Sequence, residues 1–265
     1  MSLINAFKTI NTRLASENLE NCKCILLIRT DIIKELNKRS SNLNKIMLDN
    51  SIELYWIDKE NVYPEKQMLM EMVLNKIKRT CEEYSSLSDR ELYIKLFPEK
   101  IGGQSVINYM INNSFGRPRD VICFLQIIKE RYPHETCFTA TMFKECRQSY
   151  SEAFLRELRN EMSIHIPIDV ADDYLNLIRN YGKSSFYMSN IKRYYKSHRK
   201  QYTKLSNVNN CLEDLYRFGV IGNLKKTSEN DYFSSWGYRK DGNPKADLDK
   251  KFTIHYGLRK ILNIS

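Results

Sequence analysis

The stretch Phe115-Gly116-Arg117-Pro118-Arg119-Asp120, followed by the apolar run 121–125, decides how this chain is organised. Glycine allows the backbone to turn sharply, and proline suits the first position of a helix because its missing N–H has no partner there. The stretch therefore predicts a helix that begins at Pro118 and holds Arg119 in its first turn. A guanidinium fixed in this way can bind a phosphate or a carboxylate with two parallel hydrogen bonds. The plain alternative is a helix start with two solvated arginines.

Helical patterns extend on both sides of this stretch. Residues 5–16 have a helical pattern, and Pro64 opens a helix in which Leu69, Val73 and Ile77 share one face. The longest amphipathic pattern covers 140–162, where aromatic and methionine side chains recur every three or four residues and indicate core packing. The other predicted helices cover residues 92–97, 105–113, 118–132, 170–181, 189–199 and 208–218.

Strand patterns are confined to the two ends of the chain. Residues 24–28 form a short apolar run typical of a buried parallel strand, and residues 51–56 alternate like a half-buried strand. Beyond residue 167, three short helices are followed by an extended segment, a polar hairpin over 225–250 and a closing strand at 252–255, which is the order of a winged helix-turn-helix. The predicted fold class is α+β, mainly α. The predicted domains are a partial α/β remnant (1–63), a helical bundle (64–135), a connecting helix (136–166) and a winged helix (167–265).

Composition restricts the class of partner. The 265 residues carry a net charge of +10, which favours an anionic partner, nucleic acid first and an acidic membrane surface second. No apolar run is long enough to span a bilayer and no signal peptide opens the chain, so we expect a cytoplasmic protein without a membrane partner. Seven cysteines without a C-x-x-C pair argue against a disulfide framework and a zinc site, and four isolated histidines suggest no metal centre.

A basic surface is predicted in the C-terminal domain. Between Ser189 and Lys204 there is no acidic residue, and tyrosines are interleaved with the cations. Such a face can contact phosphates. A second cluster lies beside Trp236 and Tyr238, where the tip or edge of the wing is expected. The predicted nucleic-acid-binding residues are Lys192, Arg193, Lys196, Arg199, Lys200, Lys204, Arg239 and Lys240. The alternative is a protein-contact module whose charges are merely solvated.

In this order the segments resemble the C-terminal portion of bacterial P-loop ATPases of the AAA+ and STAND type. Residues 24–31 are similar to the sensor-1 strand, with Arg29 at its polar end. Gly116-Arg117-Pro118-Arg119 is similar to the Gly-x-x-Arg signature of the helical lid. The resemblance implies that Arg119, with Arg117 and Arg29, senses nucleotide in a complete enzyme, which would also bind ATP and Mg²⁺.

The chain departs from that family because it has neither a Walker A nor a Walker B motif. Gly182-Lys183-Ser184 matches only the end of a phosphate-binding loop, and Leu177 stands where the motif requires glycine. The nucleotide-binding segments would then lie upstream of Met1, and the chain is expected to hold no cofactor and to be non-catalytic. The favoured function is the regulatory, nucleic-acid-binding portion of a P-loop ATPase, with DNA and either the missing ATPase core or partner subunits as partners. The alternatives are a protein-interaction module of an ATPase or defence complex, and a stand-alone winged-helix transcription regulator.

Overall fold

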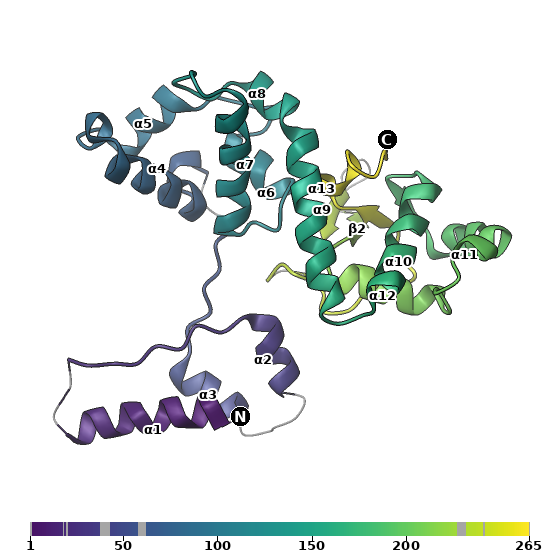
Figure 1. The fold of residues 1–265 in the computed structure, drawn as a ribbon, viewed down its shortest axis with the longest axis horizontal. Helices are drawn as coiled ribbons and strands as arrows, with labels where there is room; N and C mark the ends of the chain where they lie inside the picture. Colours follow the sequence, from purple (N-terminus) through teal and green to yellow (C-terminus); the bar gives the residue numbers. More distant parts are fainter. Residues whose placement is uncertain are drawn as a thin grey trace. The chain divides into compact units, whose positions relative to one another are not determined.

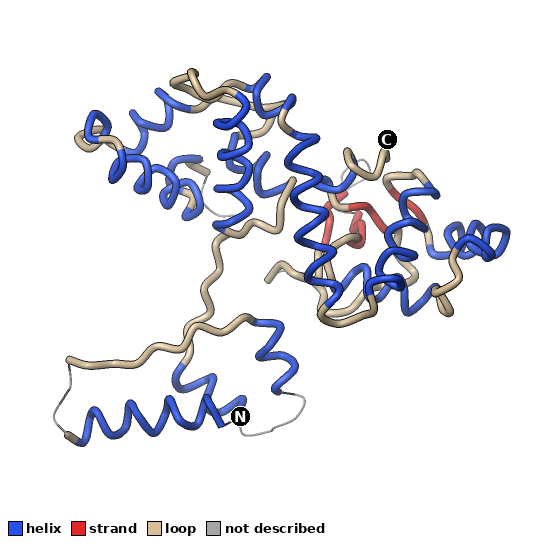
Figure 2. Tube along the Cα trace, in the orientation of Figure 1, coloured by secondary structure: helices blue, strands red, loops and turns tan. Residues whose placement is uncertain are grey.

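The computed structural model describes residues 2–17, 19, 21–37, 43–57, 62–226, 232–240 and 242–264. These residues are mainly helical, with one four-stranded antiparallel sheet, which confirms the predicted α+β class (Figure 2). The chain divides into two compact units, residues 1–54 and 55–265. The domain boundaries predicted near residues 64, 136 and 167 stay predictions.

The first unit contains three helices, α1 (Ser2–Ser16), α2 (Thr30–Asn37) and α3 (Leu43–Asn50). The helix predicted over 5–16 is therefore confirmed. The side chain of Asn11 ties α1 to the segment that follows it, because its amide donates to the Cys24 carbonyl (3.0 Å) and accepts from the Cys24 N–H (2.8 Å). Helices α2 and α3 pack against each other.

The two strands predicted in this part of the chain, 24–28 and 51–56, are wrong. Both segments lack strand pairing in the structure. In each of them two apolar side chains at alternate positions are exposed: Ile25 by 75%, Leu27 by 83%, Ile52 by 89% and Leu54 by 69%. A strand exists only through the ladder it shares with a neighbour, and an isolated pair of strands is at best marginally stable. The sequence pattern supplies the side chains of a strand but cannot supply that neighbour.

The second unit begins with a bundle of helices. Residues 67–77 follow the predicted face, because Leu69 and Val73 are buried and Ile77 packs against them. The elements are η1 (Pro64–Lys66), α4 (Met68–Thr80), η2 (Glu82–Tyr84), α5 (Asp89–Leu96), α6 (Val106–Asn112), α7 (Pro118–Arg131), α8 (Ala140–Glu145) and α9 (Arg147–Ser163). The predicted helices over 92–97, 105–113 and 118–132 are thus confirmed within a few residues.

One predicted helix is divided in two. Cys146, with ψ of −5°, ends α8 and begins α9, so the pattern over 140–162 is not one continuous helix. No glycine or proline marks this break, and Cys146 is itself fully buried. Both halves keep their apolar residues on the core side, which is why periodicity alone merges them.

The remaining elements form a helical and sheet region. They are α10 (Ile168–Tyr181), β1 (Ser185–Phe186), α11 (Met188–His198), η3 (Arg199–Gln201), α12 (Val208–Arg217), β2 (Ile221–Lys226), β3 (Tyr232–Ser235), β4 (Phe252–Ile254) and α13 (Tyr256–Arg259). The strand order is β1-β4-β2-β3, antiparallel throughout. The three predicted helices and the closing strand are confirmed.

Helix α9 connects the bundle with the sheet region. It contacts α7 on one side and α10 and α13 on the other (Figure 1). Buried hydrophobic side chains from Ile57 through Ile264 contact one another and form one connected core. The second unit therefore holds its surface elements on a rigid base.

Candidate nucleic-acid interface

Helix α11 is fixed by its buried face. Ile191 is fully buried and Tyr195 is 8% exposed, and these two residues lie four apart, one above the other on the helix. The Tyr195 hydroxyl also donates to the Leu205 carbonyl. The rotation of α11 about its own axis is therefore set. Between these anchors Arg193 is exposed and Lys192 is half-buried, whereas Tyr194 packs against the core.

The outward face of α11 and η3 carries five cations, which we call the basic surface: Lys192, Arg193, Lys196, Arg199 and Lys200. Lys192 is half-buried, and the other four are exposed. Lys192 and Lys196 lie four residues apart and Arg193 three before Lys196, so they are neighbours on one side of the helix. Across the described parts of the chain, none of the five forms an ion pair with a carboxylate. In Figure 1, α11 lies at the outer edge of the sheet region.

Lys204 differs from this group. Its backbone N–H donates to Asp173 Oδ2 (2.7 Å), and its ammonium lies 3.4 Å from Asp169 Oδ2. Both aspartates belong to α10. The ammonium that the sequence grouped with the basic surface therefore already has a carboxylate partner.

Helix α12 presents a mixed surface instead of a basic one. Asn210, Glu213 and Arg217 are exposed, and Asp214 lies 4.0 Å from the Arg217 guanidinium. Burial raises the pKa of Asp214, and the charge of Arg217 acts in the opposite direction. The outer side of α12 thus carries both signs of charge.

The second predicted basic cluster lies beside core residues. Trp236 is 2% exposed, so it is not a wing-edge side chain, and a Cβ added at Gly222 would lie 2.7 Å from its ring. Arg239 is half-buried, with its guanidinium 5.9 Å from the Tyr238 ring centroid, and Lys240 is exposed. The turn between β2 and β3 lies outside the described residues. Within those residues, neither Arg239 nor Lys240 forms a hydrogen bond or a ring contact with a residue of the basic surface.

Arg117 and Arg119 both pair with glutamates of α9. Arg117 forms a fork with Glu161, with Nη1 2.5 Å from Oε1 and Nη2 3.3 Å from Oε2, and its guanidinium lies 4.8 Å from the Phe115 ring. Arg119 pairs with Glu157, although its side chain is 64% exposed. Each guanidinium therefore has a carboxylate partner in this chain, and the nucleotide-sensing role stays a prediction.

The turn before α7 explains why these arginines are held in place. Gly116 has φ of +69°, and a Cβ there would lie 2.5 Å from Ile57 Cδ1. The buried Asp120 carboxylate accepts from the N–H groups of Phe115 (3.1 Å) and Arg117 (3.4 Å). Burial raises the pKa of Asp120, while Arg117 and these two donors oppose that rise. The predicted helix start at Pro118 is confirmed.

Arg29 belongs to the first unit. It is exposed, and its backbone carbonyl accepts from Ile33 at the start of α2 (3.1 Å). The predicted sensor role of Arg29 is untested.

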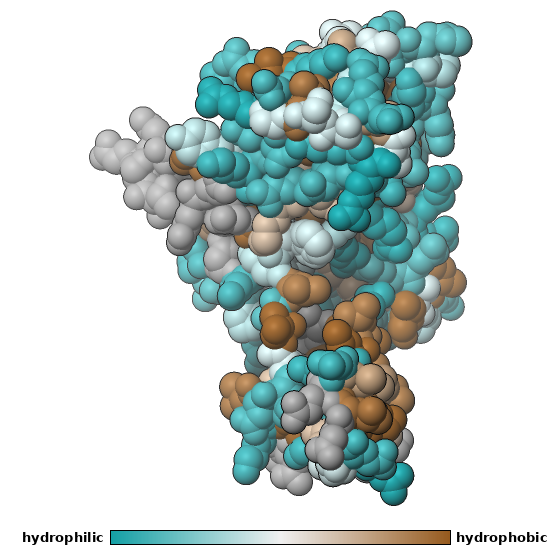
Figure 3. Space-filling model, turned by 90° about the vertical axis from the view of Figure 1, so that its left-hand side faces the viewer, coloured by the Kyte–Doolittle hydropathy of each residue, from teal (hydrophilic) through white to brown (hydrophobic). Residues whose placement is uncertain are grey.

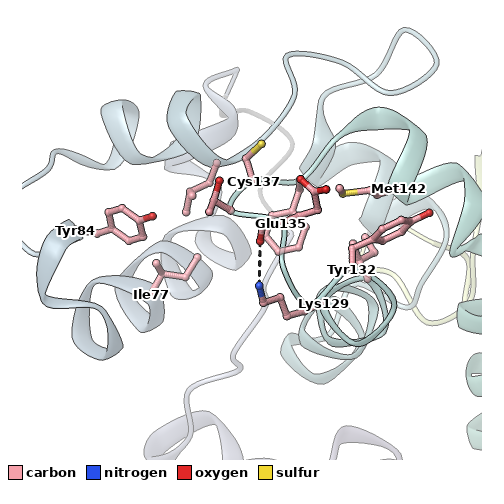
Figure 4. Close-up of a pocket in the computed structure, with 11 residues that line it drawn as sticks. Ile77, Tyr84, Lys129, Tyr132, Glu135, Cys137 and Met142 are labelled. Atoms are coloured by element: carbon pink, nitrogen blue, oxygen red, sulfur yellow. Dashed lines mark hydrogen bonds between the residues drawn. The ribbon is translucent and has the colours of Figure 1, made fainter.

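A small apolar cavity of about 180 Å³ lies in the helical bundle. Its walls come from α4, η2, α5, α7, the loop that follows α7, and α8, and include Ile77, Leu96 and Ile128. Figure 4 shows Lys129 on α7 reaching toward Glu135. The Lys129 ammonium donates to the carbonyls of Pro133 (2.7 Å) and Glu135 (3.0 Å), so it fixes the following loop. No sequence motif indicates this cavity, because its walls meet only in the folded chain.

Among the described residues, no three His, Cys, Asp or Glu side chains are grouped so that they could hold a metal ion. None of the described helices combines the length and the apolar character needed to cross a membrane.

Comparison with known protein families gives a match over part of the chain. Residues 67–159 match the model of the FunZ-associated C-terminal helical domain. The matched range extends from the residue before α4 into α9, so it covers the bundle and not the basic surface. No curated protein and no solved structure matches the chain significantly.

Proposed function

We propose that the basic surface of α11 and η3 binds the phosphate backbone of a nucleic acid, with duplex DNA as the first candidate. The observation that carries this proposal is the gathering of five cations on the consecutive elements α11 and η3, without ion-pair partners among the described carboxylates. Unpaired cations on a fixed helix neutralise phosphates and release the counterions that surround DNA. Elsewhere in the second unit, cations such as Arg117, Arg119 and Arg159 are paired with carboxylates.

Phosphate contact is favoured over base reading. We interpret residues 168–264 as a winged helix, supported by the order helix, strand, two helices and three strands, and by β4 pairing with both β1 and β2. In that fold the helix at the position of α12 normally enters the major groove. Glu213 on the exposed side of α12 would face the phosphates, and like charges repel. Binding through α11 would therefore depend little on base sequence.

The setting we propose is the regulatory portion of a P-loop ATPase, as the resemblance implies. In a complete enzyme with ATP and Mg²⁺, Arg119 could reach a phosphate only by leaving Glu157, and Arg117 only by leaving Glu161. Nucleotide binding would then break the two ion pairs that join the start of α7 to α9.

Fluorescence anisotropy with a labelled DNA duplex at low salt tests the nucleic-acid proposal. The variant Lys192→Ala/Lys196→Ala/Lys200→Ala removes three charges from the basic surface. A matched control, Lys76→Ala/Lys100→Ala/Lys144→Ala, removes three exposed lysines from the bundle. We expect affinity to fall about tenfold or more in the first variant and about twofold or less in the control. Absence of binding by the unmodified chain, or an equal loss in both variants, would refute the proposal.

A second candidate is a protein-interaction module, favoured by the exposed apolar side chains of 22–28 and 51–54. Ile25, Leu27, Ile52 and Leu54 contribute to the hydrophobic surface of the first unit, and Figure 3 shows such surface in brown. Contiguous exposed apolar surface commonly marks an interaction site. A chain that binds no DNA at low salt but loses a partner when Ile25 and Ile52 become serine would favour this candidate.

A further inference from the structure

Two arginines converge on one residue where α9 meets α13. Arg147 is the first residue of α9 and Arg259 the last of α13, and the two helices pack together. Arg147 Nη2 donates to the Tyr256 carbonyl (3.2 Å), and the Arg259 guanidinium lies 4.2 Å from the centroid of the Tyr256 ring. Both arginines are half-buried, and Tyr256 is 37% exposed. The pair is thus desolvated in part but open to solvent.

Neither guanidinium is neutralised within the described residues. No carboxylate there forms an ion pair with Arg147 or Arg259, in contrast with Arg117, Arg119, Arg131 and Arg159. Burial lowers the pKa of Arg259, Tyr256 opposes that shift, and the charge of Arg147 lowers the pKa further, as expected for two like charges near each other. An anion bound between the two guanidinium groups would offset the repulsion between their positive charges.

Hydrogen bonds hold both guanidinium groups in place. Arg259 is held by its Nε on the Ile254 carbonyl (3.1 Å) and its Nη2 on Thr253 Oγ1 (2.9 Å), and its guanidinium also interacts with the Tyr256 side chain, so the group is fixed in position. Arg147 Nε is buried and has no hydrogen-bond partner in the described structure. A buried donor without a partner is unusual, and on a charged group it is especially costly.

We propose that Arg147 and Arg259 form a binding site for a phosphate group, either of a small phosphorylated ligand or of a nucleic-acid backbone. Two guanidinium groups balance the two charges of a phosphate and offer donors for several of its oxygens. The site belongs to α9 and α13, whereas the basic surface belongs to α11 and η3. It is therefore independent of the function proposed above.

Thermal unfolding of the full chain in inorganic phosphate tests this site, with sodium chloride at equal ionic strength as the reference. Above its dissociation constant, each tenfold increase in phosphate should raise Tm by about 3 to 5 °C. Arg147→Gln should abolish the rise. Arg156→Gln, which removes one exposed charge from the same helix, should keep it. An equal rise in chloride, or a full rise in Arg147→Gln, would overturn the proposal.

A second variant keeps the test decisive if Arg147→Gln does not fold. Arg259→Lys retains the positive charge but loses the planar fork, so the phosphate-dependent rise should shrink while the chain stays folded. An undiminished rise in Arg259→Lys would count against the site.

DNA binding by Arg147→Gln then identifies the source of the phosphate. A salt dependence that becomes less steep by about 0.9 in log K against log salt assigns the site to a backbone phosphate. An unchanged salt dependence, together with the lost response to inorganic phosphate, assigns it to a small phosphorylated ligand.

Discussion

Arg117 and Arg119 begin the same helix two residues apart but have different environments. The Arg117 side chain is 39% exposed and its partner Glu161 is 13% exposed, whereas Arg119 is 64% exposed and Glu157 is 37% exposed. Solvent screens an exposed pair strongly and a partly buried fork less. Of the two arginines, Arg117 therefore fastens α7 to α9, and Arg119 is the one that a ligand could recruit.

This difference predicts unequal costs of truncation. Arg117→Met should lower the free energy of unfolding by about 2 kcal/mol, because Glu161 loses its bidentate partner in a mostly buried position. Arg119→Met should cost less than about 1 kcal/mol. Urea unfolding of the two variants measures both values, and equal losses would contradict the assignment.

His255 lies in an aromatic cage. The ring centroids of Trp236, Phe154 and Phe115 lie 4.9, 5.1 and 5.5 Å from it. Its Nδ1 accepts from the Gly257 N–H (3.1 Å), so the neutral ring carries its proton on Nε2, 3.0 Å from the Tyr238 hydroxyl. Burial, aided by the charge of Arg239, lowers the pKa of His255 to about 3.

The low pKa of His255 predicts acid sensitivity. Below pH 6.5 the unfolded chain binds a proton on this residue, but the folded chain does not until about pH 3. Stability from this group therefore falls as pH decreases through that window, by about 1.4 kcal/mol per pH unit, or about 2 kcal/mol between pH 6.5 and 5.

Urea unfolding at pH 7 and pH 5 checks this expectation. His255→Gln cannot bind the proton in either state, so its stability should change less between the two pH values than that of the unmodified chain. The same change in both proteins would show that His255 is not the group responsible.

At the scale of elements, α13 depends on one close approach. A Cβ added at Gly257 would lie 2.1 Å from the carbonyl oxygen of Asn113, the residue that directly follows α6. The Gly257 carbonyl also accepts from the Ser151 hydroxyl on α9. Only glycine lets α13 pack against both helices at once.

Gly257→Ala should therefore lower the free energy of unfolding by about 2 to 3 kcal/mol, because the backbone of α13 or the backbone at Asn113 must move to make room for the added methyl group. It should also weaken the phosphate response, because Arg259 lies two residues away on α13. Ser149→Ala, on the exposed side of α9, is the control. A stability equal to that of the control would contradict the close packing.

The elements also show what the sequence pattern could predict. Helices with a 3.6-residue apolar period, such as α4, α7, α10 and α12, were predicted because their own residues encode the buried face. The segments 24–28 and 51–56 were not, because a strand depends on a neighbouring strand. The break at Cys146 carried no local signal.

The candidate sites divide in the same way. The basic surface was predicted because its cations lie close together in sequence. The pair of Arg119 with Glu157, 38 residues apart, and the meeting of Arg147 with Arg259 depend on the packing of α9 and could not be read from either segment alone. The cluster of Arg239 and Lys240 is predicted at a wing tip or edge, but no local pattern indicates that the neighbouring Trp236 is buried.

At the scale of the whole molecule, the core belongs to the second unit. The buried residues of the continuous core begin at Ile57. Among the described residues of the first unit, by contrast, Ile4 alone is a buried hydrophobic residue. Residues 55–265 should therefore fold without residues 1–54. We expect the Tm of that fragment to lie within about 3 °C of the full chain, a shift worth roughly 1 kcal/mol for a protein of this size. A non-cooperative melt in differential scanning calorimetry would contradict this expectation.

The salt dependence of DNA affinity tests the central claim most directly. Three lysines that each contact a phosphate contribute about 2.7 to the slope of log K against log salt. The Lys192→Ala/Lys196→Ala/Lys200→Ala variant should show a slope that is less steep by about that amount, while the Lys76→Ala/Lys100→Ala/Lys144→Ala control keeps the original slope. Identical slopes for the unmodified chain and the first variant would show that the basic surface does not contact DNA.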